Sequence, residues 1–348
     1  MDIKNLTLHQ KISQMFITGF TGKNFKSNKY FSELIQNGLG GVIFFSYNID
    51  SEKQFKNLTD DISKNALVPM FFSIDQEGGK VERTEKIHGG KKYLSAKPAY
   101  GMGLSYLQNQ TKEIALELKS YGINMNFAPV LDVNTNKDNP IIGERAFSSD
   151  SDEVITAAKV VIKEYEKYGI ITVGKHFPGH GGASADSHKT LPVIDLTEKE
   201  LKQTHIKPFE EAIKSGLPAV MAAHVLYPAL DESNTPASVS EKIIGGLLIK
   251  EMGFKGVIIT DDMEMNGIKG FSRLEACKKA INAGVNMFIF RDTTKDVYNL
   301  INELETLAYE EVISKELIDK SAAKIIAQKC RYGIIQQEYK QKPHFSSK

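Results

Sequence analysis

The segment of residues 173–195, VGKHFPGHGGASADSHKTLPVID, holds the densest group of side chains that could do chemistry. His176, His180, Asp186 and His188 could together bind zinc or iron, because imidazole and carboxylate groups are ligands for both metals. Alternatively, Asp186 could fix the tautomer of His188 and make its other ring nitrogen a better base, as in a proton-transfer pair. In a third interpretation, the histidines only satisfy backbone groups of a loop. The spacing leaves these three alternatives open.

Two consecutive carboxylates end the apolar part of the segment GVIITDDMEM, residues 256–265. A buried strand that ends in this way is unusual, because it is costly to remove a carboxylate from water without a partner. Successive side chains of a strand point to opposite sides. We therefore expect one of Asp261 and Asp262 to be functional and the other to cap the following loop. A cluster at the start of a helix is the alternative for either residue.

Acidic and basic side chains also follow two other apolar segments. Asp75 begins the sequence DQEGGKVER, in which two glycines turn the chain before Arg83. A carboxylate and a guanidinium that meet at one site can bind vicinal hydroxyl groups, since the carboxylate accepts and the arginine donates hydrogen bonds. Arg145, in the segment IIGERAF, could be another donor, although a structural salt bridge with Glu144 or Asp132 fits the sequence nearly as well.

The elements that must position these residues are short apolar segments separated by longer amphipathic ones. The apolar segments are almost continuously hydrophobic, as expected for strands buried on both faces of a parallel sheet. Eight strands are predicted, at residues 14–20, 41–45, 70–75, 124–132, 171–176, 219–224, 257–261 and 286–291. Helices are predicted at residues 52–64, 110–121, 152–168, 198–214, 241–252, 273–283 and 315–329. Gly169, Gly216, Gly253 and Gly284 suit the left-handed residue that often ends a helix.

This alternation predicts an α/β fold, namely a single (β/α)8 TIM-type barrel. A doubly wound open sheet is the alternative. The barrel is favoured because polar residues end many strands, and a closed barrel gathers these ends on one rim, where barrel active sites lie. An open sheet would spread them over ~30 Å, since each strand adds ~4.8 Å. The polar residues are Asp75, Asp132, Lys175, His176, His224, Asp261, Arg291 and Asp292.

The composition is that of an ordinary globular protein, with 41% hydrophobic and 25% charged residues among 348. A net charge of +1 predicts no nucleic-acid partner, and the absence of a long apolar run predicts no membrane span. We expect residues 1–335 to form one catalytic domain and residues 336–348 a polar tail. The N-terminal residues lack the pattern of a secretory signal, which predicts a cytoplasmic protein. Cys277 and Cys330 are then expected to be buried thiols rather than a disulfide.

Taken together, these segments resemble the glycoside hydrolase family 3 β-N-acetylglucosaminidases of the single-domain bacterial NagZ type. The similarity extends over nearly the whole chain, and the shared order and spacing of the motifs is more specific than any one of them. The motifs are LTLHQKISQMFITGF, GLGGVIFFSYNI, IDQEGGKVER, FAPVLDVN, IGERAF, GKHFPGHGGASADSH and GFKGVIITDDMEM.

The resemblance assigns roles that spacing alone leaves open. It implies that Asp261 is the nucleophile, and that His188 is the general acid/base with Asp186 as its orienting partner. It implies a protein without metal or cofactor. The sugar-binding residues that it implies are Asp75, Arg83, Arg145, Lys175 and His176.

The implied reaction is hydrolysis of terminal β-GlcNAc with retention of configuration, in a monomer with a small carbohydrate or muropeptide substrate. The family suggests GlcNAc-1,6-anhydro-MurNAc fragments, with or without peptide, as in peptidoglycan recycling. Three alternatives are a phosphorylase, in which phosphate resolves the glycosyl-enzyme, a hexosaminidase for chitin oligomers, and a sugar-binding protein without catalysis. A histidine acid/base makes the phosphorylase chemically plausible, because it would not repel phosphate as a carboxylate would.

Overall fold

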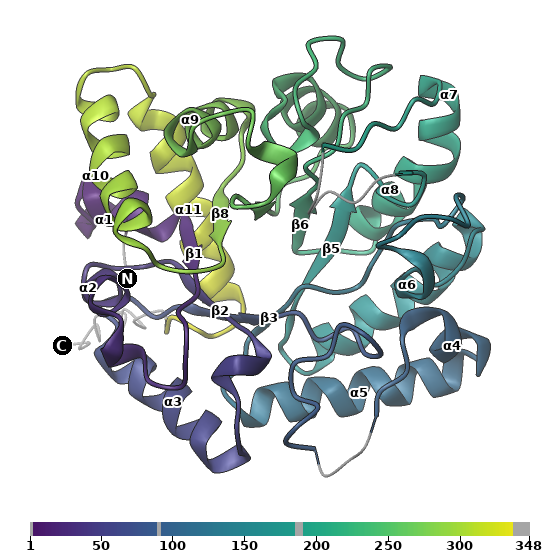
Figure 1. Cartoon of the computed structure of the whole chain (residues 1–348), viewed down its shortest axis with the longest axis horizontal. Coiled ribbons are helices and arrows are strands. Elements are labelled where there is room, and N and C mark those ends of the chain that lie inside the picture. Colours follow the sequence, from purple (N-terminus) through teal and green to yellow (C-terminus); the bar gives the residue numbers. More distant parts are fainter. Residues whose placement is uncertain (1–2, 89–91, 185–190, 337–348) are drawn as a thin grey trace, which may run out of the picture.

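The protein is a closed barrel of eight parallel strands, each paired with the strands before and after it in the chain (Figure 1). The computed structural model describes residues 3–88, 92–184 and 191–336. The predicted single (β/α)8 barrel is therefore confirmed. The strands are β1 (Phe16–Thr18), β2 (Gly41–Phe44), β3 (Phe71–Ile74), β4 (Met125–Asn126), β5 (Ile171–Phe177), β6 (Ala219–Ala222), β7 (Val257–Asp262) and β8 (Met287–Phe290).

All eight strands overlap their predicted ranges, and most are shorter than predicted. Only β5 and β7 are longer at their ends, by one residue each. Both strands change pairing register close to these ends, β5 between Gly174 and Phe177 and β7 between Ile259 and Asp262. Such irregularities change the direction of side chains and often lie beside active sites. In this barrel they fall where the predicted site residues lie.

The helices form a ring outside the strands (Figure 1). They are α1 (Leu8–Gln14), α2 (Lys29–Gln36), α3 (Glu52–Asn65), α4 (Ala96–Gly101), α5 (Leu104–Ser120), α6 (Ser151–Lys167), α7 (Glu198–Glu200), α8 (Lys207–Lys214), α9 (Arg273–Ala283), α10 (Lys295–Tyr309) and α11 (Lys315–Arg331). Two further segments, η5 (Leu201–Ile206) and η7 (Glu241–Glu251), are π-helical. The helix predicted at residues 198–214 thus consists of α7, η5 and α8, and α5 begins six residues before its predicted start.

The helix ends follow simple capping chemistry. Gly169, Gly216, Gly253 and Gly284 have φ values of +74°, +90°, +67° and +100°, so the predicted left-handed residues are confirmed. At the other end of α6, the Asp150 carboxylate accepts hydrogen bonds from the backbone N–H groups of Asp152 and Glu153. These caps set where each helix stops and where the chain turns back towards the barrel.

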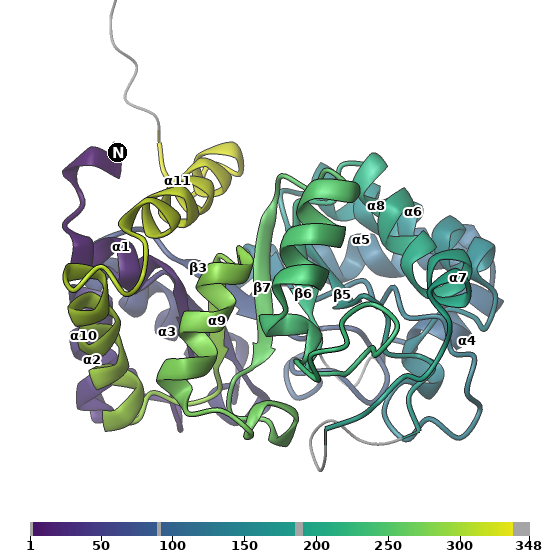
Figure 2. The ribbon, with the colours of Figure 1, turned by 90° about the horizontal axis from the view of Figure 1, so that it is seen from above.

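Different segments of the chain cover the two ends of the barrel. The N-terminal segment and α11 lie at one end, whereas the loops that follow β6 and β7 extend from the opposite end (Figure 2).

None of the helices in the described part of the chain is long and apolar enough to cross a membrane. Cys277 is buried and Cys330 partly exposed, and both thiols are free, so the prediction of two thiols is confirmed but only one is fully buried. Residues 337–348, most of the predicted tail, lie outside the described residues.

Lys329 is buried at the end of the barrel opposite the loops that follow β6 and β7 (Figure 2), and within the described residues it has no carboxylate partner. The Lys329 side chain comes from α11, and its Nζ donates a hydrogen bond of 2.7 Å to Gln14 Oε1. Lys329 Nζ also lies 5.0 Å from the centre of the Phe71 ring. Burial lowers the pKa of Lys329 well below its usual value. The native protein therefore releases this proton at a lower pH than the unfolded chain does.

We expect this lysine to make the stability of the barrel depend on pH. Between the lowered native pKa and the unfolded value of ~10.4, the unfolded state binds one proton more than the native state. The free energy of unfolding should then rise with pH by up to ~1.4 kcal/mol per unit in this window. The Lys329→Met variant should lack this increment. Urea unfolding of both proteins from pH 7 to 10 measures it, and parallel pH profiles would contradict the prediction.

Candidate active site

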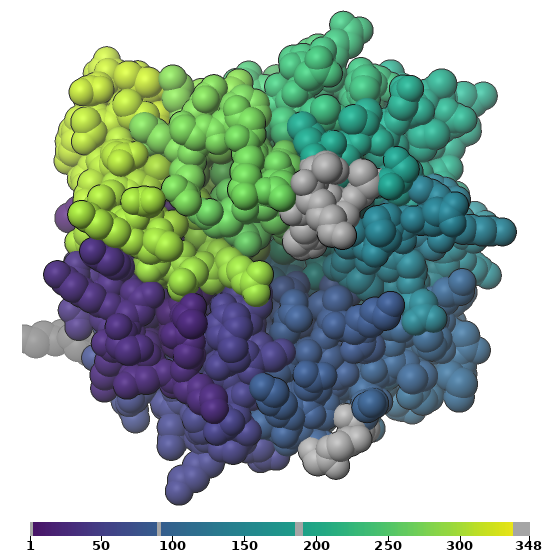
Figure 3. All heavy atoms as spheres, viewed as in Figure 1, coloured from purple at the N-terminus to yellow at the C-terminus, as the bar shows by residue number. Residues whose placement is uncertain are grey.

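A pocket of about 250 Å³ lies at the carboxyl ends of the strands. Segments from the start, middle and end of the chain meet on this face of the molecule (Figure 3). Six predicted site residues line the pocket together, namely Asp75, Arg83, Arg145, Lys175, His176 and Asp261. The other two, Asp186 and His188, lie outside the described residues. The barrel therefore brings together residues that are up to 186 positions apart in the sequence, from Asp75 to Asp261.

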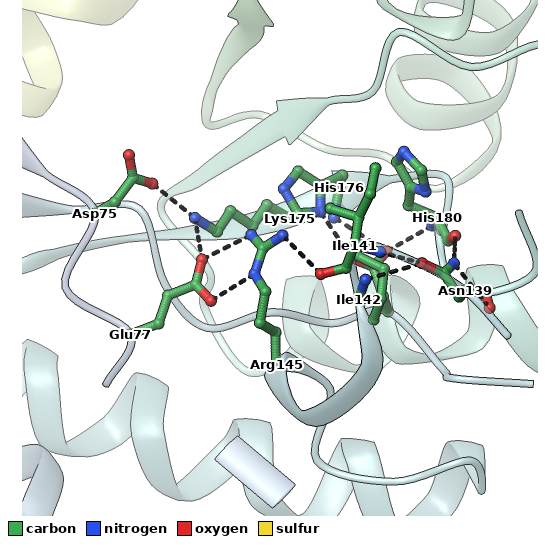
Figure 4. A network of polar contacts seen from close by, with 12 residues as sticks. Asp75, Glu77, Asn139, Ile141, Ile142, Arg145, Lys175, His176 and His180 are labelled. Atoms are coloured by element: carbon green, nitrogen blue, oxygen red, sulfur yellow. Dashed lines mark hydrogen bonds and ion pairs between the residues drawn. The ribbon is translucent and has the colours of Figure 1, made fainter. Parts of the chain in front are cut away.

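The base of the pocket is a network of paired charges (Figure 4). Lys175 Nζ lies 2.8 Å from Asp75 Oδ1 and 2.6 Å from Glu77 Oε1. Arg145 binds the same Glu77 carboxylate with two nitrogens, at 2.9 Å from Nε and 2.8 Å from Nη2. Arg83 Nη2 is 3.6 Å from Asp75 Oδ2. Four of the predicted binding residues are thus held by one another and by Glu77.

Glu77 is the site residue that sequence reasoning missed. Its side chain is only 5% exposed. Burial alone would raise the pKa of Glu77, but Arg145 and Lys175 lower it far below its usual range, so the carboxylate is ionised. The available signal was its place two residues after Asp75 and directly before Gly78. Gly78 has a φ of +96°, and a Cβ there would lie 2.3 Å from the carbonyl oxygen of Leu94, so the turn that presents Glu77 requires glycine.

Arg145 does form a salt bridge, but not with Glu144 or Asp132, the two partners that the sequence suggested. The guanidinium forms its salt bridge with Glu77, and neither Glu144 nor Asp132 is its partner. Glu144 is its neighbour in the 3-10 helix η4 (Gly143–Arg145), whereas Glu77 arrives from the loop after β3. Such a long-range pairing depends on the closure of the barrel and leaves no local trace in the sequence.

A second buried carboxylate orients His176. Asp132 Oδ2 lies 2.7 Å from His176 Nδ1, and Asp132 Oδ1 accepts hydrogen bonds from the backbone N–H groups of His176 and His180. Burial would raise the pKa of Asp132, but His176 and these hydrogen bonds lower it. An ionised carboxylate can only accept, so His176 Nδ1 carries the proton. The other ring nitrogen, Nε2, is then the one that can meet a ligand.

The two carboxylates at the end of β7 have different surroundings. Burial would raise the pKa of Asp261, but the neighbouring His176, His224 and Lys175 side chains and a hydrogen bond from the Asp262 backbone N–H lower it, so this group is ionised in the pocket. Burial raises the pKa of Asp262 to about 6. Asp262 Oδ1 accepts hydrogen bonds from the backbone N–H groups of Glu264, at 3.1 Å, and Arg291, at 3.2 Å. Asp262 therefore has the contacts of the predicted loop cap, whereas the functional role of Asp261 stays a prediction.

The sequence argument about strand alternation is wrong in one respect. It predicts that the side chains of Asp261 and Asp262 point to opposite sides of the strand, yet both line the pocket. The register shift between Ile259 and Asp262 is the reason, because it interrupts the regular alternation at the end of β7.

His224 fixes the backbone at this position. The carbonyl oxygen of Asp262 can only accept, so His224 Nε2, 3.1 Å away, donates to it. Burial lowers the pKa of His224, and in the neutral ring Nδ1 then accepts from the Ser238 hydroxyl at 2.6 Å. His224, a predicted rim residue, thus supports the end of β7 from behind.

The first part of the glycine-rich loop after β5 is firmly attached. The Asn139 amide donates to the carbonyl oxygen of His180 at 3.0 Å and accepts from the backbone N–H groups of Ile141 and Ile142 (Figure 4). The Tyr227 hydroxyl donates to Gly179, and the Asn136 amide donates to Ala183. Asn139 therefore joins this loop to the segment that carries Arg145.

Of the four residues in the alternative metal site, the structure describes two. His176 and His180 are described, and His176 Nδ1 is bonded to Asp132. Among residues 3–88, 92–184 and 191–336, no three His, Cys, Asp or Glu side chains are arranged so that they could hold a metal ion. The remaining two, Asp186 and His188, lie outside this part.

Comparisons with known proteins identify a matching family model and several relatives. The family model described as "Glycosyl hydrolase family 3 N terminal domain" matches residues 7–328. "Beta-hexosaminidase A" of Pseudoalteromonas piscicida is 37% identical over 74% of this chain and 46% of that protein. "Beta-hexosaminidase" of Methylobacillus flagellatus is 34% identical over 72% of this chain and 73% of that protein.

A solved structure agrees in fold over most of the chain. A family 3 β-N-acetylglucosaminidase from a Paenibacillus species superposes with a TM-score of 0.90, at 34% identity, over 94% of this chain and 63% of that one. This chain thus spans about half of the Pseudoalteromonas protein and less than two thirds of the Paenibacillus chain.

We expect Glu77 to be essential for the stability of the pocket. In Glu77→Gln, the buried Lys175 and Arg145 lose their shared counter-charge, which should lower the free energy of unfolding by ~3 kcal/mol. Glu211→Gln is a matched control, because Glu211 also pairs with two cations, Lys159 and Lys214, but at the surface. Its loss should be at most ~1 kcal/mol. Urea unfolding at pH 7 measures both, and equal losses would contradict the assigned role.

Proposed function

The chain belongs to glycosyl hydrolase family 3, and on this premise we propose that it is a retaining β-N-acetylhexosaminidase that removes terminal β-GlcNAc. The observation that carries the proposal is Asp261, a carboxylate with a lowered pKa that shares one pocket with an array of sugar-hydroxyl donors and acceptors. The names of the two relatives support a hexosaminidase, and the solved β-N-acetylglucosaminidase from Paenibacillus supports GlcNAc as the sugar.

In the proposed mechanism, Asp261 attacks the anomeric carbon and forms a glycosyl-enzyme ester. A retaining glycosidase needs a carboxylate that is ionised before the attack, and the positive neighbours of Asp261 favour that state. Asp262 is a poorer candidate, since its raised pKa and its two backbone hydrogen bonds favour a role in the loop.

The proposed acid/base is His188, oriented by Asp186. His188 would protonate the leaving oxygen and then, as a neutral imidazole, activate the water that hydrolyses the ester. Both residues follow a segment whose backbone is held by Asn136, Asn139 and Tyr227. This attachment supports the proposal, because it fixes the segment that directly precedes Asp186 beside the pocket, which His180 lines.

The remaining pocket residues are proposed to hold the sugar. Asp75 and Lys175 offer an acceptor and a donor side by side, as vicinal hydroxyl groups require. Arg83, Arg145 and His176 Nε2 would add further contacts around the ring. Because most of these charges already neutralise one another, the base of the pocket suits an uncharged sugar.

We further propose that the natural substrate is a peptidoglycan fragment that carries β-GlcNAc on anhydro-MurNAc, with or without peptide. The support for this finer proposal is the motif similarity to the NagZ type. A phosphorylase and a hexosaminidase for chitin oligomers remain the competing functions. The monomeric state and the cytoplasmic location stay predictions.

The test compares three variants on the nitrophenyl β-GlcNAc glycoside. Asp261→Asn should lower kcat/KM by roughly 10³-fold or more, because it removes the nucleophile. His188→Ala should cost about 10²- to 10⁴-fold. Asp262→Asn, the matched control, should lose about tenfold or less, since an amide oxygen can still accept from the backbone. A larger loss in Asp262→Asn than in Asp261→Asn would reverse the assignment of the nucleophile.

The same assay, repeated with phosphate, separates hydrolase from phosphorylase. The expected product is free GlcNAc in both buffers, whereas GlcNAc-1-phosphate would make the protein a phosphorylase. Because the pKa of Asp261 is lowered and that of Asp262 is raised to about 6, an acid limb of kcat/KM near pH 6 should not come from the nucleophile. A limb that comes from Asp262 should be lost in Asp262→Asn.

A further inference from the structure

Few contacts hold the Arg83 side chain in the pocket. Its Nη2 is 3.6 Å from Asp75 Oδ2, which is too far for a hydrogen bond. Its Cζ lies 5.8 Å from the centre of the Phe45 ring. Within the described residues, Arg83 Nε is buried and has no hydrogen-bond partner. The position of the guanidinium therefore depends mainly on where the Arg83 backbone lies.

The Gln76 side chain holds this backbone. Gln76 directly follows Asp75, and its Oε1 accepts hydrogen bonds from the backbone N–H groups of Arg83, at 2.8 Å, and Thr84, at 3.3 Å. Both partners are donors, so the side-chain atom between them is the amide oxygen and not the nitrogen. Gln76 is 1% exposed, so few water molecules can take its place as acceptor. These two bonds bring the far end of the loop back to its start at Asp75.

The barrel fixes Gln76 in turn. The Gln76 N–H donates to Asn126 Oδ1 at 2.9 Å, and Asn126 Nδ2 donates to the Gln76 carbonyl oxygen at 2.9 Å. Asn126 is the last residue of β4, and its Nδ2 also donates to the Tyr165 hydroxyl at 3.0 Å. Both polar groups of the Gln76 backbone are thus bonded to the strand next to β3. The acceptor for Arg83 therefore has a place that the ends of β3 and β4 determine.

The turn inside this loop does not replace the Gln76 bonds. The backbone N–H groups of Glu77 and Gly78 both donate to the Val81 carbonyl oxygen, at 2.9 Å and 3.2 Å. These contacts reverse the chain, but they end two residues before Arg83. Among the described residues, the acceptor for the Arg83 N–H is Gln76 Oε1.

We propose that Gln76 is a positioning residue for sugar binding and that it acts through Arg83. By holding the Arg83 N–H, it places the guanidinium beside Asp75, where one donor and one acceptor can meet vicinal hydroxyl groups. Arg83 Nε is then a donor that the substrate can use. The inference rests on the proposed function, which assigns Asp75 and Arg83 to the sugar. A residue with this role affects how tightly the sugar is held and not the attack on the anomeric carbon.

The first test separates binding from chemistry. Gln76→Met keeps the length of the side chain and removes the acceptor. It should raise KM for the nitrophenyl β-GlcNAc glycoside by roughly 5- to 30-fold and leave kcat within about threefold, because Arg83 would hold the sugar equally before and during the attack. A loss that falls on kcat rather than on KM would overturn the inference.

A double variant tests whether Gln76 acts through Arg83. Arg83→Met alone should raise KM at least as much as Gln76→Met does. If the two residues act as one unit, adding Gln76→Met to Arg83→Met should change kcat/KM by less than about twofold. Losses that multiply in the double variant would overturn the inference, because Gln76 would then act independently of Arg83.

Asn124→Leu is the matched control. Asn124 Oδ1 also accepts from a backbone N–H, that of Phe72 at 2.9 Å, but near the start of β3 instead of its end. Its replacement should leave KM within about twofold. A rise in KM equal to that of Gln76→Met would assign the effect to a general loosening of the barrel and contradict the role of Gln76.

Amide hydrogen exchange, followed by NMR, tests the contact without any activity. The Arg83 and Thr84 amides should exchange slowly in the wild type and at least about tenfold faster in Gln76→Met. If the wild type cleaves no GlcNAc glycoside, the proposed function fails, whereas this comparison still tests whether Gln76 holds Arg83. Rapid exchange of both amides in the folded wild type, a result that requires no variant to fold, would overturn the inference.

Discussion

The ionic contact between Lys175 and Glu77 is the constraint on which the pocket depends. A buried ammonium is stable only if carboxylates lie within hydrogen-bonding distance, because few water molecules can solvate it. Asp75 and Glu77 provide this compensation, and Glu77 is compensated in turn by Arg145. The contact joins β5 to the loop after β3 and, through Arg145, to η4. These three segments are therefore held in one arrangement, in which a sugar meets donors and acceptors that are already in place.

The irregular ends of β5 and β7 allow neighbouring residues of one strand to line the pocket together. A regular strand would send neighbouring side chains to opposite faces, yet Lys175 and His176 both line the pocket, as do Asp261 and Asp262. The register shifts at these ends permit this. Two buried hydrogen bonds support these positions, from His176 Nδ1 to Asp132 and from His224 Nε2 to the carbonyl oxygen of Asp262. The groups in the pocket thus depend on buried partners that never meet the substrate.

The sequence predicted the barrel because strands buried on both faces are apolar throughout and stand out from amphipathic helices. Polar groups at strand ends converge on one rim, and this argument brought Asp75, Lys175, His176 and Asp261 together, as the pocket lining has them. Arg83 lies in a loop and Arg145 in η4, and their place in the predicted binding set came from the resemblance. The sequence could not predict Glu77 as the common partner of Lys175 and Arg145, because that pairing arises from loops that meet only after closure. The π-helical turn of η5 was equally hidden: over six residues, its apolar pattern does not differ from that of an α-helix. The roles of Asp186 and His188 depend on resemblance and stay predictions.

The charges around Asp261 also bear on both halves of the proposed reaction. Positive neighbours that lower its pKa make the carboxylate a weaker nucleophile, which slows the attack on the sugar. The same neighbours make it a better leaving group, because the ester regains a stabilised carboxylate when water cleaves it. His176 and Lys175, which supply much of this field, lie in the pocket and would contact the sugar in both steps. On the proposed mechanism, the network at the base of the pocket therefore slows formation of the glycosyl-enzyme ester and speeds its hydrolysis. The ester intermediate then does not accumulate.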